Sequence, residues 1–390
     1  DAETLPLSWS EKKNVKWKTK IHDRGWSSPV IYGDQIWMTT ATKDGKKMWA
    51  VCVDRRSGKI LKNILLLENK KVEPLGNRLN GYASPSPVIE AGKVFVHFGS
   101  YGTFAIDTNT FKVLWKRTDL KCQHFRGPGS SPVLYKNLLI LTFDGIDRQY
   151  LVALDTETGK NVWLTKRSTN FRDLDKNKKP RGNGDFRKAY CTPIIVPHGG
   201  VDQLISPGAK AVIAYEAATG KEIWHVEHDG FSAASRPITY KDMVLVNTGY
   251  GRAQLLAVKL GGRGKLGGKH IRWRQTKSMP RRASPIEVDG LIYAVDDAGV
   301  FSCLDANTGS AVWRVRLKGQ SFSASPVYAA GRIFLFSQEG ITTIVTPGRD
   351  APNPGKLPTC RLGTGFMASP AIAEGAFYLR SKTHLYCIAK

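Results

Sequence analysis

The sequence predicts an all-β protein, a single β-propeller of eight four-stranded blades. One observation is a phrase of the form A-x-D-x-x-T-G-x-x-x-W that recurs along the chain. A second is a strand start with a small residue before proline, which occurs eight times. The third is the basic period of about 40 to 45 residues, which is typical of a propeller blade with four short strands. Because no 3.6-residue periodicity is present, we expect no helix longer than a short turn.

The small residue and proline mark the start of the innermost strand of each blade. One copy, ASPIEVDGLIYAV, runs from Ala283 to Val295 and contains two apolar runs around an Asp-Gly turn. Proline suits the first position of a strand because it has no N–H to donate. The copies place the blade starts near residues 27, 86, 130, 191, 235, 283, 324 and 368.

The recurring phrase supplies the third and fourth strands, and ALDTETGKNVW (Ala153 to Trp163) is its clearest copy. An apolar run predicts a buried strand, and Asp, Thr and Gly form the turn that follows it. The returning strand ends in a tryptophan with a large apolar body to bury. The phrase also occurs as AIDTNTFKVLW, AYEAATGKEIW and CLDANTGSAVW, and it degenerates near Cys52, Ala257 and Ile344.

The two ends of the chain predict how the ring closes. The eighth unit stops after its third strand, LYCIAK, and has no fourth. Residues 14–20 (NVKWKTK) resemble an isolated fourth strand with its tryptophan. We therefore expect this N-terminal strand to complete the last blade, so that residues 1–390 form one domain and no open sheet edge remains.

Two long gaps between repeats contain insertions, near residues 72–81 and 171–188. In the second, Asp173, Asp175 and Asn177 have the spacing of a calcium loop, but Lys178 stands where glycine is expected and Gly184 where an acid is expected. We favour a solvated insertion loop and predict no metal site.

Lys and Arg number 58 against 33 Asp and Glu, giving a formal net charge of +25. This excess favours attraction to polyanions, but no nucleic-acid-reading motif accompanies it, so we expect no specific nucleic-acid partner. No apolar run is long enough for a membrane helix. The chain opens at Asp1 without an apolar signal core, which suggests a mature exported protein, periplasmic or extracellular, or a trimmed chain. We expect a monomer.

Six cysteines fall into two groups. Cys52, Cys303 and Cys387 occupy the alanine position of the recurring phrase, so we expect small buried side chains on separate blades. The other three lie near loops, and one disulfide among them is open: Cys122, Cys191 and Cys360.

The recurring phrase and the Ser-Pro strand start resemble the pyrroloquinoline-quinone (PQQ)-like β-propeller family, which includes quinoprotein alcohol dehydrogenases and an outer-membrane assembly lipoprotein. The phrases DLKCQHFRGPGSSP, SPGAKAV and GFSAASRP look like a closer group of exported PQQ-like repeat proteins. The resemblance implies that each tryptophan docks between neighbouring blades. Those residues are Trp17, Trp115, Trp163, Trp224, Trp273 and Trp313.

The same resemblance raises the question of a PQQ cofactor with calcium. Quinoprotein dehydrogenases hold the quinone beside a disulfide of adjacent cysteines, and this chain has no adjacent cysteines. The Glu, Asn and Asp contexts of their calcium site are also not found. We expect no cofactor, and a PQQ-dependent dehydrogenase is the least favoured function.

Propellers bind ligands at the channel mouth, where the loops before the innermost strands converge. Arginine there could bind a carboxylate, sulfate or phosphate, and aromatic rings could stack on sugars. The predicted ligand-binding set is Arg24, Trp26, Tyr82, His124, Arg126, Arg187, Tyr190, Lys210, Arg236, Arg281, Arg282 and Phe322. The alternative is that these side chains tie the blade ends together.

Catalytic candidates are fewer. His124 with Asp144 or Asp23 could form a general acid–base pair, and Tyr190 is a further candidate. The alternative is a hydrogen-bonded structural histidine. We expect a binding scaffold for an anionic glycan or a partner protein. An enzyme acting on acidic or oxidised sugars through the same pocket is the alternative.

Overall fold

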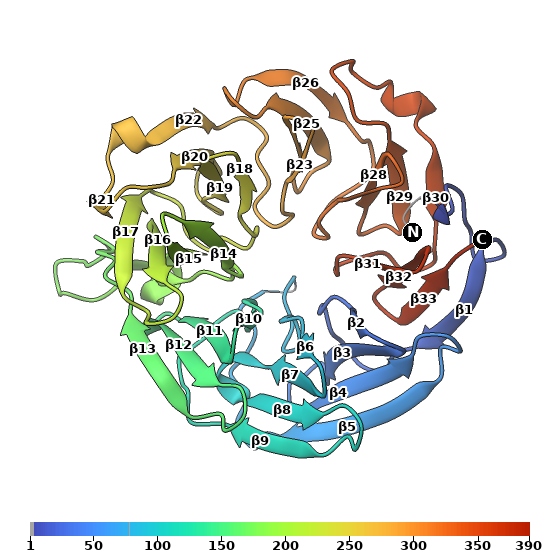
Figure 1. The fold of residues 1–390 in the computed structure, drawn as a ribbon, viewed down its shortest axis with the longest axis horizontal. Coiled ribbons are helices and arrows are strands. Elements are labelled where there is room, and N and C mark those ends of the chain that lie inside the picture. Colours follow the sequence, from blue (N-terminus) through green and yellow to red (C-terminus); the bar gives the residue numbers. More distant parts are fainter. Residues whose placement is uncertain (1–3, 78) are drawn as a thin grey trace.

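The computed structural model describes residues 4–77 and 79–390. In this part of the chain, the strands form eight sheets arranged in a ring (Figure 1). The predicted all-β propeller of eight blades is confirmed. Helical structure among these residues consists of short 3-10 segments: η2 (Gly99–Tyr101), η3 (Arg181–Arg187), η4 (Gly268–His270) and η5 (Pro354–Lys356). None of the described helices is long and apolar enough to cross a membrane.

The blades follow one another along the chain. Blade 1 contains β2 (Val30–Tyr32), β3 (Gln35–Ala41), β4 (Lys47–Asp54) and β5 (Ile60–Glu68). Blade 2 contains β6 (Val88–Glu90), β7 (Lys93–His97), β8 (Thr103–Asp107) and β9 (Val113–Arg117). Blade 3 contains β10 (Val133–Tyr135), β11 (Leu138–Asp144), β12 (Gln149–Asp155) and β13 (Asn161–Lys166). Blade 4 contains β14 (Ile194–His198), β15 (Val201–Pro207), β16 (Ala211–Glu216) and β17 (Glu222–Glu227).

The second half repeats the pattern. Blade 5 contains β18 (Ile238–Tyr240), β19 (Met243–Asn247), β20 (Leu255–Lys259) and β22 (Ile271–Gln275). Blade 6 contains β23 (Ile286–Val288), β24 (Leu291–Val295), β25 (Val300–Asp305) and β26 (Ala311–Arg316). Blade 7 contains β27 (Val327–Ala329), β28 (Arg332–Phe336), β29 (Ile341–Val345) and β30 (Thr359–Arg361). Blade 8 contains β31 (Ala371–Ala373), β32 (Ala376–Arg380), β33 (His384–Ile388) and the N-terminal strand β1 (Val15–Lys20).

The N-terminal strand closes the ring as predicted. β1 pairs antiparallel with β33, and Trp17 lies opposite Cys387. β1 and the C-terminal strand β33 accordingly lie side by side in Figure 1. The buried Arg380 strengthens the same seam, because its guanidinium donates to the backbone oxygens of Ser27 (2.9 Å) and Thr39 (2.8 Å) in blade 1. Blade 8 is thus tied to blade 1 by side chains as well as by the shared strand.

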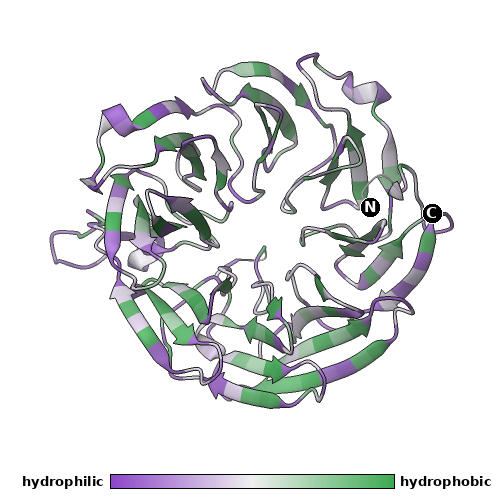
Figure 2. Ribbon diagram, viewed as in Figure 1, coloured by the Kyte–Doolittle hydropathy of each residue, from purple (hydrophilic) through white to green (hydrophobic). Residues whose placement is uncertain are grey.

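The middle strands of each blade are buried on both faces because neighbouring blades cover them. All seven residues of β11 are buried, whereas the outer strand β13 alternates between exposed and half-buried residues. Figure 2 shows polar residues interrupting the apolar ones along the rim. The core therefore consists of a series of apolar layers between adjacent blades.

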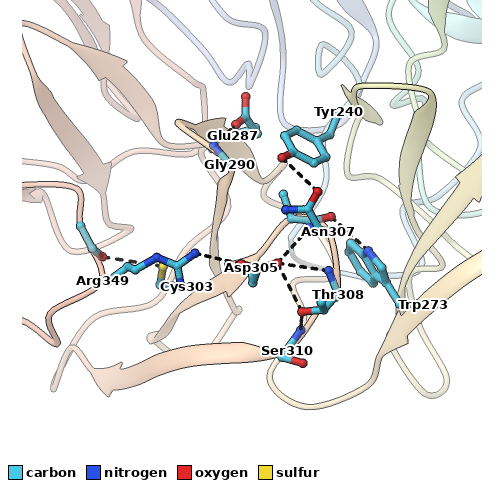
Figure 3. A network of polar contacts seen from close by, with 12 residues as sticks. Tyr240, Trp273, Glu287, Gly290, Cys303, Asp305, Asn307, Thr308, Ser310 and Arg349 are labelled. Carbon is cyan, nitrogen blue, oxygen red and sulfur yellow. Dashed lines mark hydrogen bonds and ion pairs between the residues drawn. The ribbon is translucent and has the colours of Figure 1, made fainter.

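The turn of the recurring phrase is held by its aspartate. In blade 6, one carboxylate oxygen of Asp305 accepts from the backbone N–H of Asn307 (3.1 Å) and of Thr308 (3.2 Å) (Figure 3). The other oxygen accepts from Arg349 of the next blade at 2.9 Å. Bonds of this kind are why aspartate and threonine favour turns.

The tryptophan of one blade lies on the turn glycine of the next. The indole N–H of Trp115 donates to the backbone oxygen of Thr156 at 2.9 Å, and its ring covers Gly159. Trp17, Trp163 and Trp273 lie in the same way on Gly58, Gly220 and Gly309. Trp313 of blade 6 donates to the backbone oxygen of Gly348 in blade 7. These tryptophans dock between blades as expected.

Trp224 differs in its hydrogen bond. Its indole donates to Gln203 of its own blade at 2.9 Å, although its ring still packs among residues of blades 4 and 5. A short parallel strand, β21 (Gly264–Lys265), pairs with β17 beside it. The degenerate repeat of blade 5 thus adds a fifth strand to blade 4.

Blade 1 lacks the tryptophan and blade 2 lacks the turn glycine that would receive it. Lys62 occupies the tryptophan position opposite Cys52, and Phe111 occupies the glycine position with φ of 59°. The Lys62 ammonium lies 5.6 Å from the centre of the Phe111 ring, within the range of a cation–π contact. Between blades 1 and 2, a contact between a lysine and a phenylalanine ring thus replaces the usual contact between a tryptophan and a glycine.

Blade 7 also lacks its tryptophan, and the N-terminal segment replaces it. Trp9 is 4% exposed and packs against Phe334 of blade 7 and Phe377 of blade 8, with ring centres 6.2 and 5.4 Å away. Leu5 belongs to the same cluster. The sequence pattern did not reveal this substitute, because Trp9 lies outside any repeat.

All six cysteines are buried and free, so the disulfide left open for Cys122, Cys191 and Cys360 is not formed. In the insertion loop that has calcium-like spacing, the aspartate oxygens accept hydrogen bonds from the protein itself. Asp173 is bonded by Arg187, and one carboxylate oxygen of Asp175 accepts from two backbone N–H groups.

Candidate functional site

A cavity of about 500 Å³ lies at the centre of the ring, and the loop before every blade contributes to its wall. Trp26 comes from the loop before blade 1 and Met367 from the loop before blade 8. Its lining residues are Trp26, Asn77, Leu79, Asn80, Ser84, Arg126, Gly129, Asp185, Tyr190, Thr192, Phe231, Ser232, Ala234, Tyr250, Arg282, Ser323 and Met367. Its volume suits a ligand of a few linked rings.

Four residues of the predicted ligand-binding set line the cavity: Trp26, Arg126, Tyr190 and Arg282. Two more lie beside lining residues. The guanidinium of Arg24 lies 4.8 Å from the ring centre of Trp26, and that of Arg281 lies 5.1 Å from the ring centre of Tyr250. Arg281 also lines a second cleft, of about 380 Å³, between blades 5 and 6.

The charged part of the wall is built around Asp185. Arg126 bonds both carboxylate oxygens of Asp185, at 3.0 and 2.8 Å. The Lys188 ammonium lies 2.6 Å from the same carboxylate and donates to the Tyr190 hydroxyl at 2.8 Å. Burial raises the pKa of Asp185, but the bonds from Arg126 and Lys188 outweigh it and leave the pKa lowered. Two cations facing one anion leave this wall positive.

Lys188 is unusual because its side chain is fully buried. Burial lowers the pKa of Lys188 to about 8, and Asp185 opposes this change. The ammonium lies over the rings of Phe125 and Tyr190, 5.2 and 5.3 Å from their centres. Such contacts stabilise a desolvated cation.

Asp185 was not among the predicted site residues, whereas Lys188 lies with Arg187 and Tyr190 in a loop that was expected at the channel mouth but was not assigned to the ligand-binding set. The signal that could have identified Lys188 is its spacing from Tyr190, because residues two apart in an extended segment share a face. Asp185 carries no such signal, since its position depends on the path of the insertion that contains η3.

Four predicted residues lie elsewhere, with other roles. Tyr82 is buried between blades 1 and 2, where its hydroxyl donates to the backbone oxygen of Glu73 at 2.8 Å. Arg187 forms a two-point ion pair with Asp173. Lys210 donates to the backbone oxygen of Asp229 at 2.6 Å, and Phe322 is fully buried in an apolar cluster. For these residues the alternative of a structural role describes the observed contacts.

The acid–base pair expected from His124 and Asp144 is not formed. His124 is buried, and its Nε2 accepts from the backbone N–H of Ser100 at 2.9 Å. Burial lowers the pKa of His124 to about 4. Asp144 is bonded at both oxygens by the buried Arg167, at 2.6 and 2.8 Å. Asp23, the other expected partner, bonds His22 at 2.7 Å.

A ring of hydroxyl groups surrounds the central axis. In seven of the eight blades, the residue before the proline donates its backbone N–H to the hydroxyl of the corresponding residue in the next blade. Seven such bonds of 2.8 to 3.1 Å are present. We call this set the hydroxyl ring: Ser28, Ser86, Ser131, Thr192, Ser284, Ser325 and Ser369.

Arg236 is the one residue at these eight positions that has no hydroxyl. It is exposed, and its backbone N–H donates to Ser284 Oγ at 2.9 Å. No hydroxyl therefore faces the backbone N–H of Thr192, so the ring is interrupted between blades 4 and 5. The break adjoins the cavity, because Thr192 lines it.

Comparison with known proteins agrees with the architecture. The family model described as outer membrane protein assembly factor BamB matches residues 71–176 and 267–346. The BamB of Yersinia pestis is 26% identical over 241 residues, which cover 49% of this chain and 58% of that protein. The match thus spans less than two thirds of that relative.

Solved structures extend the likeness over nearly the whole chain. BamB from Moraxella catarrhalis has a TM-score of 0.63 at 12% identity and covers 96% of this chain and 99% of its own. Quinohemoprotein alcohol dehydrogenase from Comamonas testosteroni has a TM-score of 0.65 at 14% identity, with coverage of 100% and 79%. A europium-containing methanol dehydrogenase has a TM-score of 0.62 at 15% identity, with coverage of 97% and 86%. At these identities the structures show the fold alone.

The repeats of this β-propeller are similar to those of PQQ-like propellers. Over about half of its length the chain is similar in sequence to BamB proteins.

The residues of the cavity do not fit PQQ held with calcium. Calcium takes six to eight oxygen ligands, usually with several carboxylates. Asp185 is the one carboxylate among the lining residues, and its oxygens are already bonded by Arg126 and Lys188. The donor set of this wall is suited to an anion.

Proposed function

We propose that this chain is a binding scaffold whose central cavity holds an anionic ligand, of which an acidic saccharide is the best match. The observation that carries the proposal is the cavity itself, with aromatic rings and arginines brought together from separate blades. Trp26, Phe231 and Tyr250 offer apolar faces to sugar rings, and Arg126 and Arg282 offer donors to a carboxylate.

The hydrogen bonds of the candidate catalytic residues favour a binding function over a catalytic one. His124 and Asp144 are buried and bonded to Ser100 and Arg167, so neither is available to a substrate in the cavity. Tyr190 remains in the wall, where its hydroxyl accepts from Lys188. The hydroxyl keeps its own proton, which it can donate in a hydrogen bond to a ligand.

Calorimetric titration with glucuronate, oligogalacturonate and uncharged glucose tests the proposal. We expect the uronates to bind and glucose to bind at least 10-fold more weakly. Arg126→Ala and Arg282→Ala each remove charge-assisted hydrogen bonds and should weaken uronate binding roughly 10-fold or more. Arg148→Ala, at an exposed side chain outside the cavity, is the matched control. If both cavity variants bind uronate as the unchanged protein does, the proposal is wrong.

We further propose that the protein is exported, to the periplasm or the cell exterior, and that it acts as a monomer without a PQQ cofactor. Light scattering checks the mass in solution. Adding PQQ and calcium is expected to give neither alcohol-dependent dye reduction nor a shift in Tm.

A second function, in the assembly of other proteins, is favoured by the similarity to BamB proteins, which are described as outer membrane protein assembly factors. Apolar side chains are exposed on the outer strands β5, β9 and β13 of blades 1 to 3. These strands follow one another along the rim of the ring (Figure 1), and exposed apolar patches are typical of protein contacts. The exposed side chains are Ile60, Leu61, Leu65, Val113, Leu114, Val162 and Leu164.

Complementation of a bacterium that lacks its own BamB tests this second function. We expect restored outer-membrane protein levels, and a loss of that effect in Leu114→Glu with Val162→Glu. Leu174→Glu changes an equally exposed leucine in the insertion loop and is the control. No restoration by the unchanged chain would contradict the assembly role.

A further inference from the structure

Several polar groups without hydrogen-bond partners among the described residues lie at the break in the hydroxyl ring. Among the residues that the structure describes, the backbone N–H of Thr192 has no hydrogen-bond acceptor. Its counterparts in the other blades each donate to a hydroxyl of the next blade. The unpaired N–H follows directly from the replacement of serine or threonine by Arg236.

Two further donors lie at the same point of the chain. The hydroxyl of Ser235 is fully buried and has no partner among the described residues. The Arg236 side chain forms no ion pair or hydrogen bond within the same set of residues. The Cys191 thiol donates to the backbone oxygen of Ser235 at 3.1 Å, so the segment that contains Arg236 lies beside the segment that contains Thr192.

We propose that this break is an anion-binding point in which the Thr192 N–H and the Arg236 guanidinium together hold one oxyanion, a carboxylate or a sulfate. The inference rests on the proposed function where it assigns the oxyanion to the acidic group of the saccharide. The Thr192 N–H and the Arg236 guanidinium can only donate, and the buried, unpaired Ser235 hydroxyl requires an explanation such as a bound ion or water. The positive charge of Arg236 favours an anion over a cation at this point.

The position suits a ligand that also occupies the cavity. Thr192 belongs both to the hydroxyl ring and to the cavity wall, and Tyr190 is two residues before it. A carboxylate at the break thus lies at the edge of the space where Tyr190 and Phe231 offer their rings. Arg236 would then bind the charged group of the ligand, and the aromatic rings would pack against its sugar rings.

Arg236→Ser repairs the ring and removes the guanidinium in one step. Because its new hydroxyl can accept from Thr192, we expect the Tm without added anion to rise by about 1 to 2 °C. We expect its affinities for inorganic sulfate and for glucuronate to fall at least 10-fold. Arg252→Ser makes the same change at an exposed arginine of blade 5 and should alter neither. Arg236→Gln lacks both the charge and the short hydroxyl, so it should lose the anions without the gain in Tm.

A crystal soaked in bromide locates the ion directly. We expect an anomalous peak within hydrogen-bond distance of the Thr192 N–H in the unchanged protein and none in Arg236→Ser. Absence of the peak, with an ordered water in its place, overturns the inference. So does Arg236→Ser that binds sulfate and glucuronate as tightly as the unchanged protein.

The same measurements separate this inference from the proposed function. If glucuronate binding depends on Arg126 and not on Arg236, the cavity is a saccharide site and the break is not part of it. If sulfate and bromide bind at the break in an Arg236-dependent manner while no uronate binds, the anion point stands and the saccharide proposal falls.

Discussion

The glycine of each acidic turn is required both by its backbone angle and by the ring that covers it. Gly159 has φ of 67°, and a Cβ at this position would lie 2.7 Å from the Trp115 ring. Gly159→Ala therefore adds backbone strain and forces the tryptophan out of its place. We expect the free energy of unfolding to fall by about 2 to 4 kcal/mol, measured in urea.

Gly331 provides the matched control. Its φ of 66° is nearly the same, but a Cβ there would meet nothing within 4 Å. Gly331→Ala should lose only the strain, about 1 kcal/mol. Equal losses at the two positions would show that the tryptophan contact is not what demands glycine.

Three buried histidines predict a loss of stability in mild acid. Burial lowers the pKa of His97 and His228 to about 3 and that of His124 to about 4. Between these values and the unfolded pKa of about 6.5, the unfolded chain binds protons that the folded chain does not. Stability should thus be complete above pH 6.5 and decrease as the pH falls towards 4.

His124→Gln tests this pH dependence. From pH 7 to pH 5 each buried histidine should account for about 2 kcal/mol of the lost free energy of unfolding. The variant should show a shallower decrease, whereas His22→Gln, at a more exposed histidine, should follow the unchanged protein. An unchanged slope in His124→Gln would contradict the assignment.

At the scale of the element, the contact between blades 7 and 8 depends on the N-terminal segment. Trp9 fills the position for which blade 7 has no tryptophan. Trp9→Ala removes a large buried side chain from an apolar layer and should cost about 3 to 5 kcal/mol in denaturant unfolding. Leu7→Ala, at a side chain that is 47% exposed, should change stability by less than about 0.5 kcal/mol. Similar effects of the two changes would contradict the role of Trp9.

At the scale of the whole molecule, the net charge of +25 predicts general attraction to polyanions. We expect retention on heparin that decreases steeply with salt, because exposed charges are screened over about 10 Å at 0.1 M. Arg126→Ala should elute almost with the unchanged protein, since it removes one charge among many. Salt-independent retention would instead indicate a specific heparin site.

The sequence predicted the repeat architecture because that information is local and redundant. The turn of Asp155 and Gly159 is a pattern within a few residues, and several copies confirm one another. The closing strand was predictable for the same reason. The last blade lacks a fourth strand, and the N-terminal segment has the pattern of an isolated fourth strand. The contacts of Trp9 and of Lys62 with Phe111 were not predicted. Each replaces a tryptophan–glycine contact between two blades, and neither residue pair forms a recurring sequence pattern.

The candidate site was predicted less well. Proximity to a blade start identified Trp26, Arg126, Tyr190 and Arg282. The same criterion also selected Tyr82 and Phe322, which the structure buries between blades. Position along the chain reports which loop a side chain occupies, but the rotation of the strand decides whether it faces the axis or the neighbouring blade.

The sequence by itself determined the β-propeller, its eight blades and its closure, because strand periodicity, turn chemistry and repeat length are properties of short segments. Only the tertiary structure decided which charges meet. It brings Asp185 to Arg126 and Lys188, gives His124 and Asp144 separate partners, and leaves the Thr192 N–H without an acceptor among the described residues. Hydrogen bonds and ion pairs form over a few ångströms, and closing the ring sets those distances between residues that lie far apart in the chain.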